Sequence, residues 1–130
     1  MEQVCLDSTW IYDFLKGKQK AIAALEAVKS SHSIATTSIN AYEIIYGLLR
    51  KNEMEKLAAV MQFFKSVRIL DFDLIAADKA AKIGTTLEKK GKTINEFDIL
   101  VAGAMLTNGC YKIVTENVKD FQKVDGLSVF

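Results

Sequence analysis

Hydrophobic positions along this 130-residue chain fall into short apolar runs separated by longer stretches with helical spacing. Short runs rich in β-branched residues and bounded by polar residues are typical of buried strands. Five segments fit this description: residues 4–6, 34–37, 67–72, 111–114 and 127–130, with the last expected at the sheet edge. Between them the apolar residues recur every three or four positions, which predicts amphipathic helices.

The helical spacing covers residues 9–15, 19–30, 74–90 and 95–108, and two further segments that begin at residues 38 and 52. Gly17 separates the first two helices, and Gly109 follows the 95–108 helix. Strands that alternate with helices favour a parallel sheet covered on both faces. We therefore predict a single α/β domain over residues 1–130, built as a three-layer α/β/α sandwich around a central, mostly parallel sheet.

Composition supports a soluble globular protein, with 50% hydrophobic and 25% charged residues. No apolar run reaches the length of a membrane span, and the first three residues lack the basic start of a signal peptide. Cys5 and Cys110 form no CxxC pair, so buried thiols in a reducing compartment are the expected state. We expect no membrane contact and a cytoplasmic location. His32, the only histidine, lies in a serine-rich segment and is interpreted as a loop residue.

Four acidic residues stand at the boundaries of apolar segments: Asp7, Glu43, Asp98 and Asp120. Each is expected where a strand ends or a helix begins, and in parallel α/β sheets these places meet at one edge. Carboxylates that lie close together repel one another unless a cation compensates them. An oxygen-only set of ligands suits Mg²⁺ or Mn²⁺. The sequence therefore predicts a metal site at this edge.

Each acid also has a purely structural explanation. Asp7 can cap a helix, and Asp120 can serve as a turn or cap residue. Glu43 and Asp98 each follow an asparagine by three residues, which is the spacing of a capping box. Both have apolar flanks, however, and a carboxylate beside buried surface needs a partner. The four acids taken together favour the metal site more than any one of them does.

A metal site of this kind suits hydrolysis of a phosphodiester bond, because a divalent ion activates water and stabilises charge on a phosphoryl group. His32 has no evident serine or cysteine partner for covalent catalysis. A phosphatase of the haloacid dehalogenase type would need an aspartate where Thr9 stands. A receiver domain would need adjacent acids near the first strand. The net charge of +1 and the small lysine groups give only weak support for a polyanionic partner.

Residues 4–9, 37–47, 94–104 and 114–121 together resemble the PIN-domain ribonucleases, and among these the VapC-type toxins of prokaryotic toxin–antitoxin pairs. The resemblance covers essentially the whole chain. It implies an α/β/α sandwich and an acidic pocket that binds Mg²⁺ or Mn²⁺. It also implies an endoribonuclease that hydrolyses RNA by means of a metal-activated water.

Position by position, Asp7, Glu43 and Asp98 match the three core acids of the family, and Asp120 matches the more variable fourth. Thr115 and Asn117 match polar positions beside that fourth acid and are expected to orient ligands or contact RNA. The resemblance further implies a homodimer and a cognate antitoxin whose C-terminal segment occupies the groove.

Two positions depart from the family pattern. Glu116 stands where many relatives carry a basic residue, which would alter RNA contacts. Ser8 replaces a frequent threonine and should keep the hydroxyl group. PIN domains also act in RNA processing, and a silent RNA- or protein-binding module is a third interpretation. Six apolar residues of two adjacent helices are expected mainly in the core, with part of them on a dimer or antitoxin surface: Ile44, Ile45, Leu48, Met61, Phe63 and Phe64.

Overall fold

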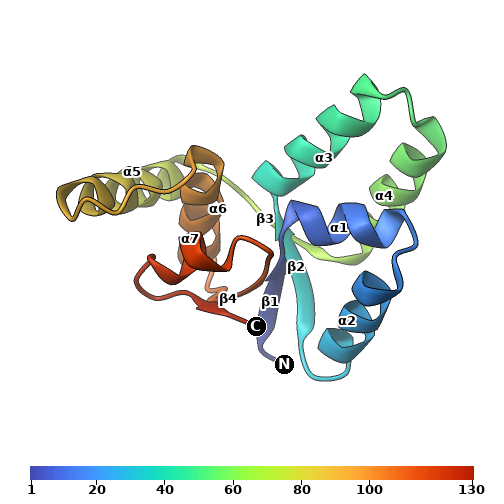
Figure 1. The fold of residues 1–130 in the computed structure, drawn as a ribbon, viewed down its shortest axis with the longest axis horizontal. Coiled ribbons are helices and arrows are strands. Elements are labelled where there is room, and N and C mark those ends of the chain that lie inside the picture. The colour runs from blue at the N-terminus through green and yellow to red at the C-terminus, as the bar shows by residue number, and fades with distance from the viewer.

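The computed structural model describes residues 1–130 and places one sheet between two groups of helices (Figure 1). All paired strands run parallel, in the order β3-β2-β1-β4-β5. Their bounds are β1 Gln3–Leu6, β2 Ser33–Thr37, β3 Arg68–Leu70, β4 Lys112–Val114 and β5 Ser128–Val129. The predicted strands are thus all present, although β3 and β5 are shorter than expected. The parallel sheet covered by helices confirms the predicted α/β architecture.

Helices α1 to α4 cover one face of the sheet and α6 and α7 the other, and α5 packs against α6 (Figure 1). Their bounds are α1 Ser8–Leu15, α2 Gln19–Lys29, α3 Ser38–Arg50, α4 Met54–Ser66, α5 Leu74–Lys89, α6 Glu96–Thr107 and α7 Val118–Gln122. Gly17 has a φ of 73°, a conformation that glycine adopts easily, and it joins α1 to α2 as predicted.

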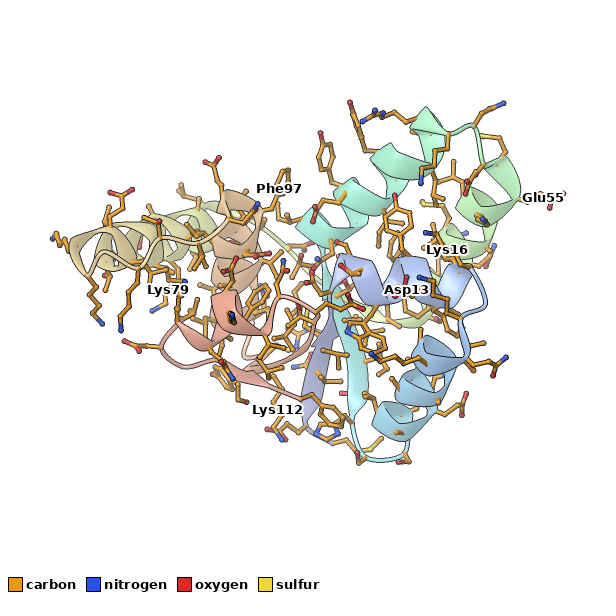
Figure 2. The ribbon with its side chains drawn as sticks, viewed as in Figure 1. Asp13, Lys16, Glu55, Lys79, Phe97 and Lys112 are labelled. Atoms are coloured by element: carbon orange, nitrogen blue, oxygen red, sulfur yellow. The ribbon has the colours of Figure 1, made fainter.

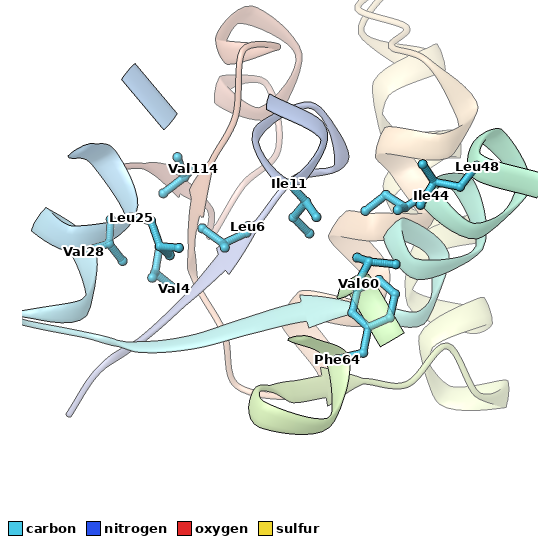
Figure 3. Packing of buried hydrophobic residues seen from close by; sticks show 10 residues of the cluster. All are labelled: Val4, Leu6, Ile11, Leu25, Val28, Ile44, Leu48, Val60, Phe64 and Val114. Carbon is cyan, nitrogen blue, oxygen red and sulfur yellow. The ribbon is translucent and has the colours of Figure 1, made fainter. Parts of the chain in front are cut away.

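Side chains of β1 alternate between the two layers of helices. Val4 and Leu6 pack with residues of α1 to α4 in a cluster of ten buried residues (Figure 3). Cys5 points to the other face, into a cluster that includes Met105 of α6 and Phe121 of α7. Burial on both faces explains why β1 reads as a continuous apolar run rather than an alternating one.

The amino end of α3 is capped differently from the prediction. Thr37 is the N-cap: its side chain accepts from the Asn40 backbone N–H, and Asn40 returns a bond to Thr37. The alternative explanation of Glu43, a capping box with Asn40, is therefore wrong, because the helix begins directly after β2 and places Glu43 in its second turn. Asp7 and Asp73 do cap α1 and α5. Helix α7, which carries Asp120, was not predicted.

The six apolar residues considered for a partner surface divide between core and surface. Ile44, Leu48 and Phe64 are buried, as the core interpretation requires, whereas Met61 is exposed. Ile45 and Phe63 are partly buried and pack against the same core. A partner surface built from Ile44, Leu48 and Phe64 is therefore ruled out in the folded chain.

The remaining sequence expectations concern the thiols, the histidine and the membrane. Cys5 and Cys110 are free and buried, and burial raises the pKa of both thiols. His32 precedes β2, at the end of the sheet opposite the carboxyl ends of the strands, and its ring packs edge-on against Phe130. Among the helices, none combines the length and apolar character that crossing a membrane requires.

Candidate active site

All buried polar side chains of the molecule lie at the carboxyl ends of the strands or in the helix turns that follow. They are Asp7, Thr36, Thr37, Asn40, Asp98 and Thr115. Asp7 follows β1, Thr115 follows β4, and Asp98 lies in the first turn of α6. Burying polar groups is unfavourable unless they find partners, so a cluster confined to one edge marks that edge as a site.

Asp7 is held by hydrogen bonds from three surrounding segments. Its Oδ1 accepts from the Ser8 backbone N–H and from Asn40 Nδ2, both at 2.9 Å. Its Oδ2 accepts from Thr115 Oγ1 at 2.6 Å. The carboxylate therefore serves as the cap of α1 and, at the same time, connects β1 with α3 and β4. Asp7 is thus a helix cap and a site residue at the same time, through the same set of hydrogen bonds.

Glu43 lies half-buried in the second turn of α3, on the side facing Asp7. Ser8 Oγ donates to its Oε1 at 3.1 Å. Burial raises the pKa of Glu43, the Ser8 hydrogen bond opposes this, and the negative charge of Asp7 raises it further. Glu43 is thus a carboxylate whose charge the protein compensates only in part.

Asp98 is the most perturbed acid of the site. Its side chain is 6% exposed, and Asn117 Nδ2 donates to its Oδ2 at 3.3 Å. Burial, followed by the adjacent carboxyl of Asp120 and the charge of Asp7, raises the pKa of Asp98 to about 7. Asp120 itself lies in α7, and its Oδ2 accepts weakly from the Asn95 backbone N–H at 3.5 Å.

None of the four acids forms an ion pair with a lysine, arginine or histidine. No protein cation therefore compensates the four carboxylates by direct pairing. Such an oxygen-only set suits a hard divalent ion. In the structure as it stands, however, no three acidic, histidine or cysteine side chains converge closely enough to form a metal centre. The carboxylates are instead two neighbouring pairs, and the charge of Asp7 acts on Glu43 and on Asp98.

An open cleft adjoins the first of these pairs. Ser8 and Glu43 line it together with Thr9, Tyr12, Asp13, Lys16 and Lys51. Asp13 is paired with Lys18 at 3.2 Å, which leaves Lys16 and Lys51 as cations available to a ligand in the cleft. Figure 2 shows Asp13 in α1 and Lys16 at the carboxyl end of that helix. Acidic and basic walls in one cleft can accommodate a metal ion beside a phosphate group.

The structure places the acids that the sequence singled out at one sheet edge, as two pairs, along with Ser8, Thr115 and Asn117. Glu116 is exposed. One residue was missed in its present role: Asn40, which contacts both Asp7 and Ser8. The sequence does show that Asn40 is an amide inside an otherwise apolar segment. That position was interpreted only as a helix cap.

Comparison with known proteins agrees with this fold. The PIN domain family matches residues 4–127. The chain is 34% identical over 92 residues to the tRNA(fMet)-specific endonuclease VapC of Shigella flexneri, covering 70% of this chain and 69% of that protein. It is 28% identical over 130 residues to the protein of the same name from Salmonella typhimurium, covering 99% and 97%.

A solved structure of similar shape is the DNA-bound VapBC complex of Salmonella typhimurium. One chain of it superposes with a TM-score of 0.83 at 28% identity, covering all of this chain and 98% of that chain. This chain therefore belongs to the PIN domain family and, within it, to the VapC ribonucleases.

Proposed function

We propose that this protein is the toxin of a toxin–antitoxin pair, an endoribonuclease that depends on Mg²⁺ or Mn²⁺ held by Asp7, Glu43, Asp98 and Asp120. The single observation that carries the proposal is four carboxylates at one sheet edge, none of which forms an ion pair with a lysine, arginine or histidine. Burial, and then the neighbouring carboxyl groups of Asp120 and Asp7, raise the pKa of Asp98 to about 7. A divalent ion is the simplest species that stabilises all four in their ionised form.

When bound, the ion lowers the pKa of a coordinated water and neutralises charge on the phosphoryl group. The chain's own residues hold the ligands in place. Ser8 Oγ orients Glu43, Thr115 Oγ1 orients Asp7, and Asn117 Nδ2 orients Asp98. Residues that contact the metal-binding side chains, rather than the metal itself, influence both metal affinity and catalytic activity.

We infer that the RNA strand enters the cleft beside Ser8 and Glu43. Lys16 and Lys51 border this cleft and are suited to contact phosphates on either side of the scissile bond. The relatives named as tRNA(fMet)-specific endonucleases support RNA as the substrate class, with transfer RNA as the first candidate to test.

We propose a cognate antitoxin as the protein partner, on the strength of the solved VapBC complexes. An apolar groove between α1, α2 and α4 offers it a surface, lined by Leu6, Trp10, Ile11, Phe14, Ala21, Ala24, Leu25, Phe63 and Val114. Trp10 Nε1 is buried there without a hydrogen-bond partner within the chain.

We also propose a homodimer. Tyr42 and Tyr46 of α3 are exposed, and Tyr42 stacks on Phe97 at the start of α6 with ring centroids 6.3 Å apart. Figure 2 shows Phe97 at the end of α6 that faces α3. Exposed aromatic residues that gather in this way are enriched in protein interfaces. RNA and a co-produced antitoxin would both be met in the cytoplasm, which is where we propose the protein acts.

The test is cleavage of defined transfer and messenger RNAs by purified protein over a range of Mg²⁺ and Mn²⁺ concentrations. We expect cleavage that a chelator abolishes and that Asp7→Asn and Asp98→Asn remove, while the exposed control Asp125→Asn retains it. Undiminished cleavage by Asp98→Asn in nuclease-free preparations would contradict the proposal. Metal-independent RNA binding without cleavage would instead indicate a silent binding module.

A further inference from the structure

Asn40 is fully buried and uses its whole side chain at the boundary between the α3 cap and the acidic site. Its Oδ1 lies 2.7 Å from Thr37 Oγ1 and 3.4 Å from the Thr37 backbone nitrogen. Its Nδ2 lies 2.9 Å from Asp7 Oδ1 and 2.9 Å from Ser8 Oγ. A buried amide with four polar neighbours has little freedom to reorient.

The orientation of this amide is fixed by the chemistry of two neighbours. The Thr37 backbone N–H can only donate, so the oxygen of Asn40 must face it. An ionised Asp7 carboxylate can only accept, so the nitrogen of Asn40 must face it. A flipped amide would place oxygen against oxygen at Asp7 and nitrogen against nitrogen at Thr37.

The fixed amide also sets the direction of the next hydrogen bond. One Nδ2 proton goes to Asp7, and the other goes to Ser8 Oγ. Ser8 Oγ therefore acts as an acceptor toward Asn40, and its single proton is left for Glu43 Oε1 at 3.1 Å. The bonds thus run in one direction, from Thr37 through Asn40 and Ser8 to Glu43.

We propose that Asn40 is a positioning residue of the metal site, an inference that rests on the proposed function. Its amide nitrogen fixes the position and orientation of Asp7 directly, and those of Glu43 through Ser8, as metal ligands. The α3 cap alone does not explain it. That cap uses the backbone N–H and the side-chain oxygen of Asn40, which a serine or an aspartate can also supply. The amide nitrogen serves only the site.

The test compares Asn40→Asp and Asn40→Ser with Asn108→Asp. Both Asn40 variants keep an oxygen for the cap and remove the amide donor. Asn108 is the matched control, because its Nδ2 donates to the backbone carbonyls of Ala104 and Asp71, outside the site. For each variant, Tm is measured without metal and over a Mn²⁺ titration, and cleavage is measured over the same titration.

We expect both Asn40 variants to raise the Mn²⁺ concentration for half-maximal effect by about 10- to 100-fold in both measurements, the usual cost of losing a group that orients a ligand. Asn108→Asp should lower the metal-free Tm and leave the metal response unchanged. The double variant Ser8→Ala/Asn40→Ser should raise the half-maximal Mn²⁺ concentration by less than the two single variants combined, because both residues act on Glu43.

The outcomes separate this inference from the proposed function. If the wild-type protein shows a metal response and both Asn40 variants respond at the same Mn²⁺ concentration, the positioning role is wrong and the proposed function stands. If the Asn40 variants lose only metal-free stability, as Asn108→Asp does, the residue is a helix cap and nothing more. A wild-type protein without any metal response would overturn the proposed function and this inference together.

Discussion

The two halves of the acidic site differ in what holds their carboxylates. In the first half, Asp7 accepts three hydrogen bonds and Glu43 accepts one. In the second, a single amide bond at 3.3 Å reaches Asp98, while the neighbouring carboxyl of Asp120 opposes its charge. Fixed donors thus prepare the first half for a ligand, whereas the second half holds repelling carboxyl groups that either a proton or a metal cation stabilises.

The largest expected effect distinguishes Asp98 from Asp7. Each Asp→Asn change should reduce cleavage by more than about 100-fold, which exceeds the loss expected for a residue that only contacts a metal ligand. Their effects on the metal-free protein should differ. Asp98→Asn removes a repelled charge and should leave Tm unchanged or raise it, whereas Asp7→Asn breaks buried bonds and should cost about 1–3 kcal/mol of stability. Thermal denaturation without metal measures this difference. Equal losses of Tm in the two variants would contradict the proposed difference between the two halves of the site.

The next effect is the dependence of stability on pH. The pKa of Asp98 is raised from 3.8 to about 7, so the folded state binds a proton more tightly than the unfolded state. Its contribution to stability is fully present below 3.8 and is lost as the pH rises through about 7. Tm of the metal-free protein should therefore fall across this window more steeply than Tm of Asp98→Asn. Saturating Mg²⁺ should flatten the wild-type curve, and identical pH curves for the two proteins would contradict the account.

A third effect concerns the helix that carries Asp98. Gly103 of α6 packs so closely on α5 that an added Cβ would lie 2.8 Å from the Ala76 oxygen and from Ala80 Cβ. Gly103→Ala should therefore destabilise the protein by about 1–3 kcal/mol. The control is Gly84→Ala, whose Cβ would meet only Ile99 at 3.6 Å and which should be neutral or stabilising. Denaturant unfolding measures both, and equal stability of the two variants would show that α6 is free to shift.

The smallest effect compares two orienting groups. Ser8→Ala removes the donor to Glu43, and Asn117→Ala removes the donor to Asp98. Both should reduce cleavage about 10-fold, the low end for groups that orient metal ligands. The Asn117 effect should be the smaller, because its bond is longer and its residue is exposed. Initial rates at saturating Mg²⁺ test the order, and a larger loss from Asn117→Ala would reverse it.

Much of the fold could be predicted from the sequence, because its local signals agree with the packing. The apolar runs at β1 and β4 are buried on both faces, and Gly17 and Asp73 act where their backbone chemistry suggests. Helix α7 escaped prediction because its five residues show barely more than one turn of periodicity. Its position depends on Phe121, whose burial comes from contacts with distant segments.

The site was predictable in its residue types and not in its hydrogen bonds. Acids at strand and helix boundaries indicated which edge of the sheet carries them. The direction of the hydrogen bonds through Asn40 depends on α3 beginning directly after β2, with Thr37 as its N-cap. The spacing of residues in the sequence did not predict this cap. An Asn three residues before a Glu fits a capping box equally well, and only the Thr37 cap distinguishes the two arrangements.

The most direct test of the central claim is calorimetric titration of the metal-free protein with Mn²⁺ near pH 7, in two buffers of different ionisation enthalpy. The account predicts binding that releases protons, because Asp98 is partly protonated at this pH and must ionise to bind the metal. Asp98→Asn should bind far more weakly and release no protons. Absence of binding by the wild-type protein, or equal binding and proton release by Asp98→Asn, would contradict the four-carboxylate metal site.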